Sequence, residues 1–88
     1  MKRNPDFLIK NVAGKQVLVP VGQAAVSFPG MVTVNDTGKY IWELLETEQT
    51  LDSVAEAIAC RYDVPLSTAL EDAGLFLDRL MSVKAVIE

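Results

Sequence analysis

The sequence contains no histidine and a single cysteine, Cys60. Zinc sites need three or four Cys, His or carboxylate ligands, and one thiol cannot form an intramolecular disulfide. The schemes that use histidine as a general base, or as the partner of a nucleophile, are excluded as well. Because Cys60 has no basic neighbour four residues away in either direction, we expect a buried or half-buried, unreactive thiol.

Phosphate-binding loops and long apolar segments are also missing. No glycine-rich loop has the spacing that holds a nucleotide phosphate. No apolar run reaches the roughly 18–20 residues of a membrane helix, and the polar first six residues lead into no apolar block of the signal-peptide type. We therefore expect a cytoplasmic protein that does not contact a membrane, has no cofactor and is not an enzyme.

The positive charge that nucleic-acid binding requires is scarce in residues 40–88, where the helices are expected. The chain has a net charge of −4, with five Lys or Arg against two Asp in residues 1–39 and three against ten carboxylates in residues 40–88. The first part is therefore +3 and the second −7. A recognition helix for DNA needs Lys or Arg side chains aimed at phosphates and bases. We expect no nucleic-acid partner, even for a fold of winged-helix shape.

A length of 88 residues, with 50% hydrophobic and 23% charged residues, is typical of one small globular domain that spans residues 1–88. Its first part predicts three short antiparallel strands over residues 7–12, 16–21 and 31–34. A turn with a glycine at residues 13–15 joins the first two strands, and a Pro-Gly turn at residues 27–30 precedes the third.

At Asn35 the apolar periodicity changes from two residues to about 3.6, which predicts a helix. Asn35 or Asp36 can accept a hydrogen bond from the first unpaired N–H groups of that helix. Gly38 would cost about 1 kcal/mol relative to Ala in the first turn, so it predicts close packing of another group against the backbone.

Two more helices follow. Thr50 caps the second, which ends before Pro65, and the third spans residues 67–82. The tail at residues 83–87 is either a last strand or an arm docked on the core. Trp42 is expected in the core rather than stacked on a ligand. The predicted core positions of the three helices are Ile41, Leu44, Leu45, Leu51, Val54, Ala55, Ile58, Tyr62, Leu66, Ala69, Leu70, Ala73, Leu77 and Leu80.

The third helix has a second, partly apolar face. At 100° per residue, Leu75 falls opposite the core positions, with Phe76 beside it and Asp72 and Arg79 at its border. A scattered surface leucine and a binding groove explain this pattern equally well. The third strand is short enough to lie at a sheet edge, where an extended peptide could add a strand and place side chains in such a groove.

Four motifs in fixed order resemble the PqqD-like family, named for the pyrroloquinoline quinone biosynthesis protein D. They are N-x-T-G-x-x-I-W-x-L-L from Asn35, T-x-x-x-V-A from Thr50, Y-D-V from Tyr62, and D-x-x-x-F-L-x-x-L from Asp72. The resemblance implies an α+β, winged-helix-like fold with a three-stranded antiparallel sheet followed by three helices. It also implies a peptide chaperone that recognises the leader of a ribosomally made precursor peptide and presents it to a modifying enzyme, often a radical S-adenosylmethionine protein.

Carried over to this sequence, the family's peptide site would lie between the third strand and the third helix. The alternative is a non-catalytic interaction or regulatory domain that binds another protein but no leader peptide. A small sheet next to the turn at residues 27–30 is compatible with a monomer or with a strand-exchanged homodimer. The residues expected to bind peptide are Met31, Val32, Thr33, Val34, Asp72, Leu75, Phe76 and Arg79.

Overall fold

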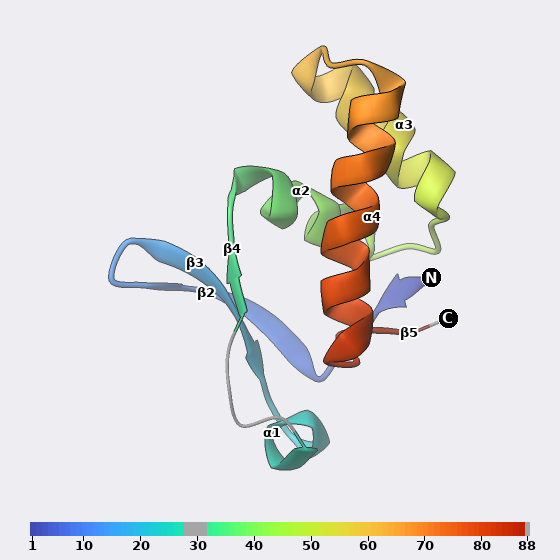
Figure 1. The fold of residues 1–88 in the computed structure, drawn as a ribbon. Helices are drawn as coiled ribbons and strands as arrows, with labels where there is room; N and C mark the ends of the chain where they lie inside the picture. The colour runs from blue at the N-terminus through green and yellow to red at the C-terminus, as the bar shows by residue number, and fades with distance from the viewer. Residues whose placement is uncertain (28–31, 88) are drawn as a thin grey trace.

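The computed structural model describes residues 1–27 and 32–87, and it places a small sheet on one side of the molecule and the longer helices on the other (Figure 1). This is the predicted α+β architecture, with a three-stranded antiparallel sheet that precedes three helices. In chain order the elements are β1 (Lys2–Arg3), β2 (Phe7–Val12), β3 (Lys15–Pro20), α1 (Gln23–Ser27), β4 (Val32–Val34), α2 (Asp36–Leu44), α3 (Leu51–Tyr62), α4 (Leu66–Ser82) and β5 (Val86–Ile87).

The sheet has the order β2-β3-β4, so β3 is central and β2 and β4 form the two edges. The two-residue turn between β2 and β3 places Ala13 and Gly14 at positive φ, as hairpin turns with the right-handed strand twist require. The Gly14 N–H donates to the Asn11 side-chain oxygen at 3.1 Å, which holds the turn in place. The three predicted strands are confirmed. Met31, and residues 28–30 of the predicted turn, lie outside the described residues.

The helix starts are set by the side chains that the sequence indicated. The Asn35 side-chain oxygen accepts the Gly38 N–H at 2.8 Å at the start of α2. At the start of α3, the Thr50 hydroxyl accepts the Ser53 N–H at 3.0 Å, and the Ser53 hydroxyl accepts the Thr50 N–H at 2.9 Å. This reciprocal arrangement satisfies two main-chain donors that a helix start leaves unpaired. Asp63, in the left-handed region at φ 52°, ends α3.

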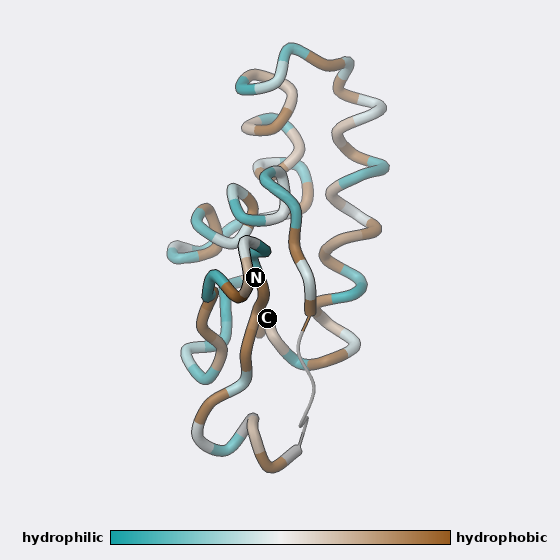
Figure 2. Tube along the Cα trace, turned by 90° about the vertical axis from the view of Figure 1, so that its left-hand side faces the viewer, coloured by the Kyte–Doolittle hydropathy of each residue, from teal (hydrophilic) through white to brown (hydrophobic). Residues whose placement is uncertain are grey.

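The core lies between the sheet and the helices. It receives Leu18, Val32 and Val34 from the sheet, together with Trp42 from α2, as expected for that tryptophan. Each of the longer helices contributes one stripe at helical spacing, and the trace of α4 in Figure 2 carries hydrophobic residues along its whole length. The buried positions of α3 and α4 are Val54, Ala55, Ile58, Ala69, Ala73, Leu77 and Leu80.

Four burial predictions are wrong, and all concern positions near a helix end or on the solvent side. Leu51, Tyr62 and Leu66 are exposed because they begin or end their helices, beyond the neighbouring element that covers the rest of the stripe. Tyr62 instead packs edge-on against Tyr40, with ring centroids 6.1 Å apart. Cys60 is also exposed, because it lies two residues after the buried Ile58 and therefore on the opposite side of α3.

The two chain ends meet in a small second sheet. β1 pairs antiparallel with β5, with Lys2 opposite Ile87 and Arg3 opposite Val86. The tail therefore forms a strand, one of the two arrangements expected for it, and Val86 packs into the core. The sequence did not predict β1 or the short helix α1. Within the described residues, no helix is long and apolar enough to cross a membrane.

Candidate functional site

Strand β4 is an edge strand, because β3 is the one strand that pairs with it among the described residues. The Val21 N–H donates to the Asp6 carbonyl oxygen at 2.7 Å, which fixes the alternation of bonds across the sheet. In antiparallel ladders, bonded and non-bonded pairs alternate. Val32 and Val34 therefore direct their main-chain groups toward β3, whereas Thr33 directs its N–H and C=O outward. An incoming strand could bond to Thr33 without disturbing the sheet.

The side chains of β4 do not form a pocket. Val32 and Val34 are buried in the core, and the exposed side chain of Thr33 alternates with them onto the other face of the sheet. Met31 lies outside the described residues. Of the four strand residues expected to bind peptide, three are described, and among these Thr33 alone offers main-chain groups to an added strand. Any side-chain recognition has to come from elsewhere.

A groove with exposed side chains lies along α4. Asp72, Leu75, Phe76 and Arg79, the four helix residues expected from the sequence, line one groove of about 320 Å³. Leu75 has 64% of its surface exposed, and Phe76 is half-buried. The groove thus has an apolar centre with a carboxylate and a guanidinium on the same wall.

The opposite wall is the first turn of α2, which the sequence had not placed in the site. Its lining residues come from the motif that begins at Asn35, where the capped start brings the chain from β4 up against α4. The signal that could have found them was the glycine in a first turn, which already indicated close packing of another group. The lining residues of this wall are Asn35, Thr37, Gly38 and Ile41.

Gly38 shows how closely the two walls approach. A Cβ atom at this position would lie 3.1 Å from both Cε1 and Cζ of Phe76, and 3.3 Å from the Asn35 side-chain oxygen. Distances of this kind are tighter than ordinary van der Waals contact, so any larger residue would push the Phe76 ring from its place. The absence of a side chain at Gly38 therefore sets the position of Phe76 in the groove.

The charges of the groove are available to a ligand. Asp72 and Arg79 are both exposed, and neither forms an ion pair within the part of the chain that the structure describes. They lie seven residues apart, which is about two helical turns or 10.5 Å along the axis. The groove can therefore hold an apolar side chain at its centre and meet one charge of each sign at its two ends.

Comparison with known proteins identifies the family. The profile of the family described as "Coenzyme PQQ synthesis protein D (PqqD)" matches residues 15–86. The chain belongs to the PqqD family. The match includes β3, β4 and all three longer helices, so both walls of the groove lie within it. The resemblance drawn from the four motifs is confirmed.

A solved structure of TbiB1 in complex with the TbiA(beta) leader peptide has the same fold. It superposes with a TM-score of 0.73 at 24% sequence identity, and the alignment covers 97% of this chain and 93% of that one. At this identity the likeness concerns the fold alone, and it covers nearly the full length of the chain. A search of the curated proteins gave no match.

Proposed function

We propose that this PqqD-family protein binds the leader of a ribosomally made precursor peptide as a strand added to β4, and presents it to a modifying enzyme. The observation that carries this proposal is the coincidence of an open strand edge with a groove centred on the exposed Leu75. Main-chain bonds along the edge give affinity, and pockets for alternate side chains give specificity. The leader peptide bound to TbiB1, which shares the fold, supports the same class of ligand.

The direction of the bound leader follows from the arrangement of β4 and α4. An added strand would run antiparallel to β4, as in the rest of this sheet, because antiparallel pairs are the slightly more stable kind. β4 and α4 run in opposite directions (Figure 1). The leader would therefore run in the same direction as α4, and pass Asp72 before Phe76 and Arg79.

The spacing along α4 is close to that of alternate strand residues for the first pair of positions and about 2 Å shorter for the second. Asp72 and Phe76 are about 6 Å apart along the helix axis, and Arg79 lies about 4.5 Å further on. Alternate side chains of a strand, which share one face, are about 6.6–6.8 Å apart. The leader would thus carry a basic residue, an apolar residue two positions later and an acidic residue two positions after that.

The proposed role is binding without catalysis. The chain contains no histidine, and among the described residues no group of three or more Cys, Asp or Glu side chains could hold a metal ion. The chemistry would reside in the modifying enzyme, for which a radical S-adenosylmethionine protein is the candidate suggested by the family. The protein would contribute the capture and orientation of the leader.

The test begins with the protein purified from a lysate of its source cells, with copurified material analysed by mass spectrometry down to short peptides. We expect a small precursor together with a larger enzyme. The leader of that precursor, synthesised with a fluorescent label, is then titrated against the pure protein by fluorescence anisotropy. Recovery of one large protein without any peptide would contradict the proposal and favour a general interaction domain.

A further inference from the structure

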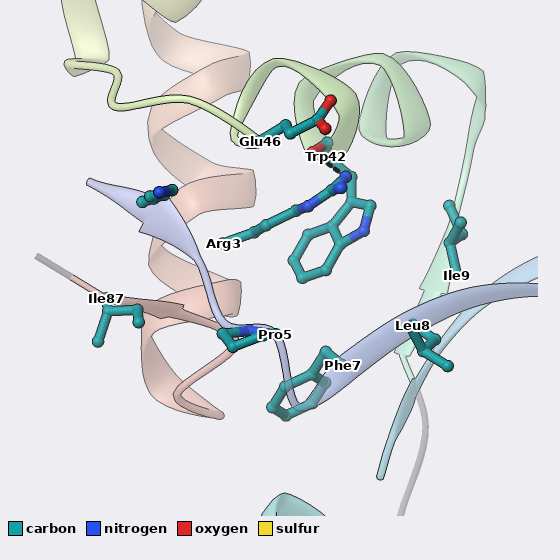
Figure 3. Close-up of a pocket in the computed structure, with 9 residues that line it drawn as sticks. Arg3, Pro5, Phe7, Leu8, Ile9, Trp42, Glu46 and Ile87 are labelled. Carbon is teal, nitrogen blue, oxygen red and sulfur yellow. Dashed lines mark hydrogen bonds between the residues drawn. The ribbon is translucent and has the colours of Figure 1, made fainter.

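A second groove lies at the other edge of the sheet, beside β2 (Figure 3). Its volume is about 600 Å³. The groove is formed by the start of β2, the segment that precedes it, α2 and β5, and it does not share a lining residue with the groove at α4. Its apolar lining consists of Pro5, Phe7, Leu8, Ile9, Trp42 and Ile87.

The main chain of β2 is open from Ile9 onward, whereas the N–H of Phe7 donates to the Asn4 carbonyl oxygen. Within the described sheet, β2 pairs with β3 alone. The alternation fixed by the bond from Val21 to Asp6 directs the N–H and C=O groups of Ile9 and Asn11 away from β3. Unpaired groups at a sheet edge are a template for another extended chain. The molecule therefore has two open edges, each next to its own apolar groove.

Arg3 gives this second groove its charge. Its guanidinium lies 5.7 Å from the centre of the Trp42 ring, and Nη1 donates to the Trp42 carbonyl oxygen at 3.3 Å (Figure 3). Arg3 is half-buried, and in the described part of the chain no carboxylate comes within ion-pair distance of it, not even that of Glu46 on the same groove. With Lys2 also in the lining, the groove has a net charge of +1 in a chain of net charge −4.

We propose that this groove docks an extended, acidic segment of a partner protein as a strand added to β2. Apolar side chains of the segment would contact the exposed Leu8 and Ile87, and one Asp or Glu carboxylate would pair with the Arg3 guanidinium, whose fork geometry suits a carboxylate. A second copy of this chain fits less well, because it would bring two grooves of the same net positive charge together. The site is independent of the leader proposed at β4.

The probe is a phage-displayed library of random 12-residue peptides, selected against the wild-type protein and remeasured as synthetic peptides. We expect one class that combines alternating apolar residues with a carboxylate. Its affinity should fall about tenfold or more in Leu8→Asp and in Arg3→Gln. The affinity of these peptides should be unchanged in Leu75→Asp, which acts on the other groove. Failure of this proposal can therefore be told apart from failure of the leader proposal.

Val12→Asp is the matched control. Val12 lies on β2 and on the same sheet face as Leu8, and the two have nearly equal exposure, 46% and 47%, but Val12 lies outside the groove. It should leave the affinity of the acidic class unchanged, and circular dichroism should show that all the variants are folded. Should Arg3→Gln unfold, Leu8→Asp alone decides.

Three results would overturn the proposal. One is a selection that yields no peptide weakened by Leu8→Asp. Another is a class that binds this groove but carries Lys or Arg in place of a carboxylate. The third is a homodimer in analytical ultracentrifugation that Leu8→Asp dissociates, which would assign the β2 edge to a second copy.

Discussion

The two apolar faces of α4 differ in what covers them. One face, with Ala69, Ala73, Leu77 and Leu80, is buried in the core. The other face has Leu75 exposed beside the half-buried Phe76 in the middle of the helix. On α3, by contrast, the exposed large hydrophobic residues, Leu51 and Tyr62, lie at the two ends of the helix. A helix that only covers a core needs one apolar stripe. The second face of α4 is the one proposed to bind the leader, and the experiments below separate the two faces.

The largest expected effect is on stability. Leu80 is fully buried in the core, so Leu80→Ala should lower the free energy of unfolding by about 2–5 kcal/mol through loss of buried area and formation of a cavity. Leu75→Ala should change it by less than about 0.5 kcal/mol, as is usual for surface substitutions. Urea unfolding followed by circular dichroism measures both. Equal losses of unfolding free energy would show that both faces of α4 contribute alike to the core.

Leu70 provides an intermediate case in this comparison. The sequence placed it in the core stripe, but the structure shows it half-buried at the edge of the core. We now expect Leu70→Ala to destabilise the protein by about 1 kcal/mol, which is less than the full core value. A loss as large as that of Leu80→Ala in the same urea experiment would contradict the burial described for this helix.

The next effect concerns the proposed leader. Leu75→Asp should weaken binding of the leader recovered with the wild-type protein about tenfold or more, since it places a charge at the apolar centre of the groove. Leu66→Asp, on an exposed leucine of the same helix but outside the groove, is the matched control. Anisotropy titration compares the two. If both variants weaken binding equally, the negative charge added to the helix, rather than the change in the groove, is responsible.

A smaller effect should follow from Gly38→Ala. The new methyl group would meet the Phe76 ring at 3.1 Å and displace it from its position in the groove, so leader binding should weaken a few-fold. Alanine gains up to about 1 kcal/mol of helix propensity, which offsets the strain, and stability should change little. The pair Gly38→Ala with Phe76→Leu should recover binding in part. Failure of the shorter side chain to do so would argue against this contact.

The smallest expected effect is on charge preference. Exchanging the two groove charges in the double variant Asp72→Arg, Arg79→Asp should favour a leader in which the basic and acidic residues are exchanged as well. The change should be a few-fold and should shrink at high salt, because exposed charges are screened. A preference that stays the same in both proteins would contradict the direction proposed for the leader.

Most of the fold could be predicted because its signals are local. The turn at Ala13 and Gly14, the caps Asn35 and Thr50, and the change of periodicity at Asn35 depend on near neighbours in the chain. The pairing of β1 with β5 could not be predicted, since it joins two-residue segments from opposite ends of the chain. Exposure at helix ends also depends on where the neighbouring element stops, which periodicity alone does not report.

The candidate site was predicted on one side only. The helical wheel found Leu75, Phe76 and their charged neighbours because they depart from a one-stripe pattern. The α2 wall was missed, since a polar capping turn such as Asn35 and Thr37 looks the same whether or not another helix packs against it. The sequence also could not show that Val32 bonds to β3 whereas Thr33 faces outward. Proline at Val32 would therefore disturb the sheet, and Thr33 is the position that reports on the edge.

The most direct test of strand addition is hydrogen exchange at the Thr33 amide, measured by NMR with and without saturating leader peptide. The Thr33 N–H points away from β3, so it should exchange quickly in the free protein and about tenfold or more slowly in the complex, when it donates to the added strand. The amides of Val32 and Val34, which face β3, should change much less. Unchanged exchange at Thr33 while the leader is bound would contradict binding along β4.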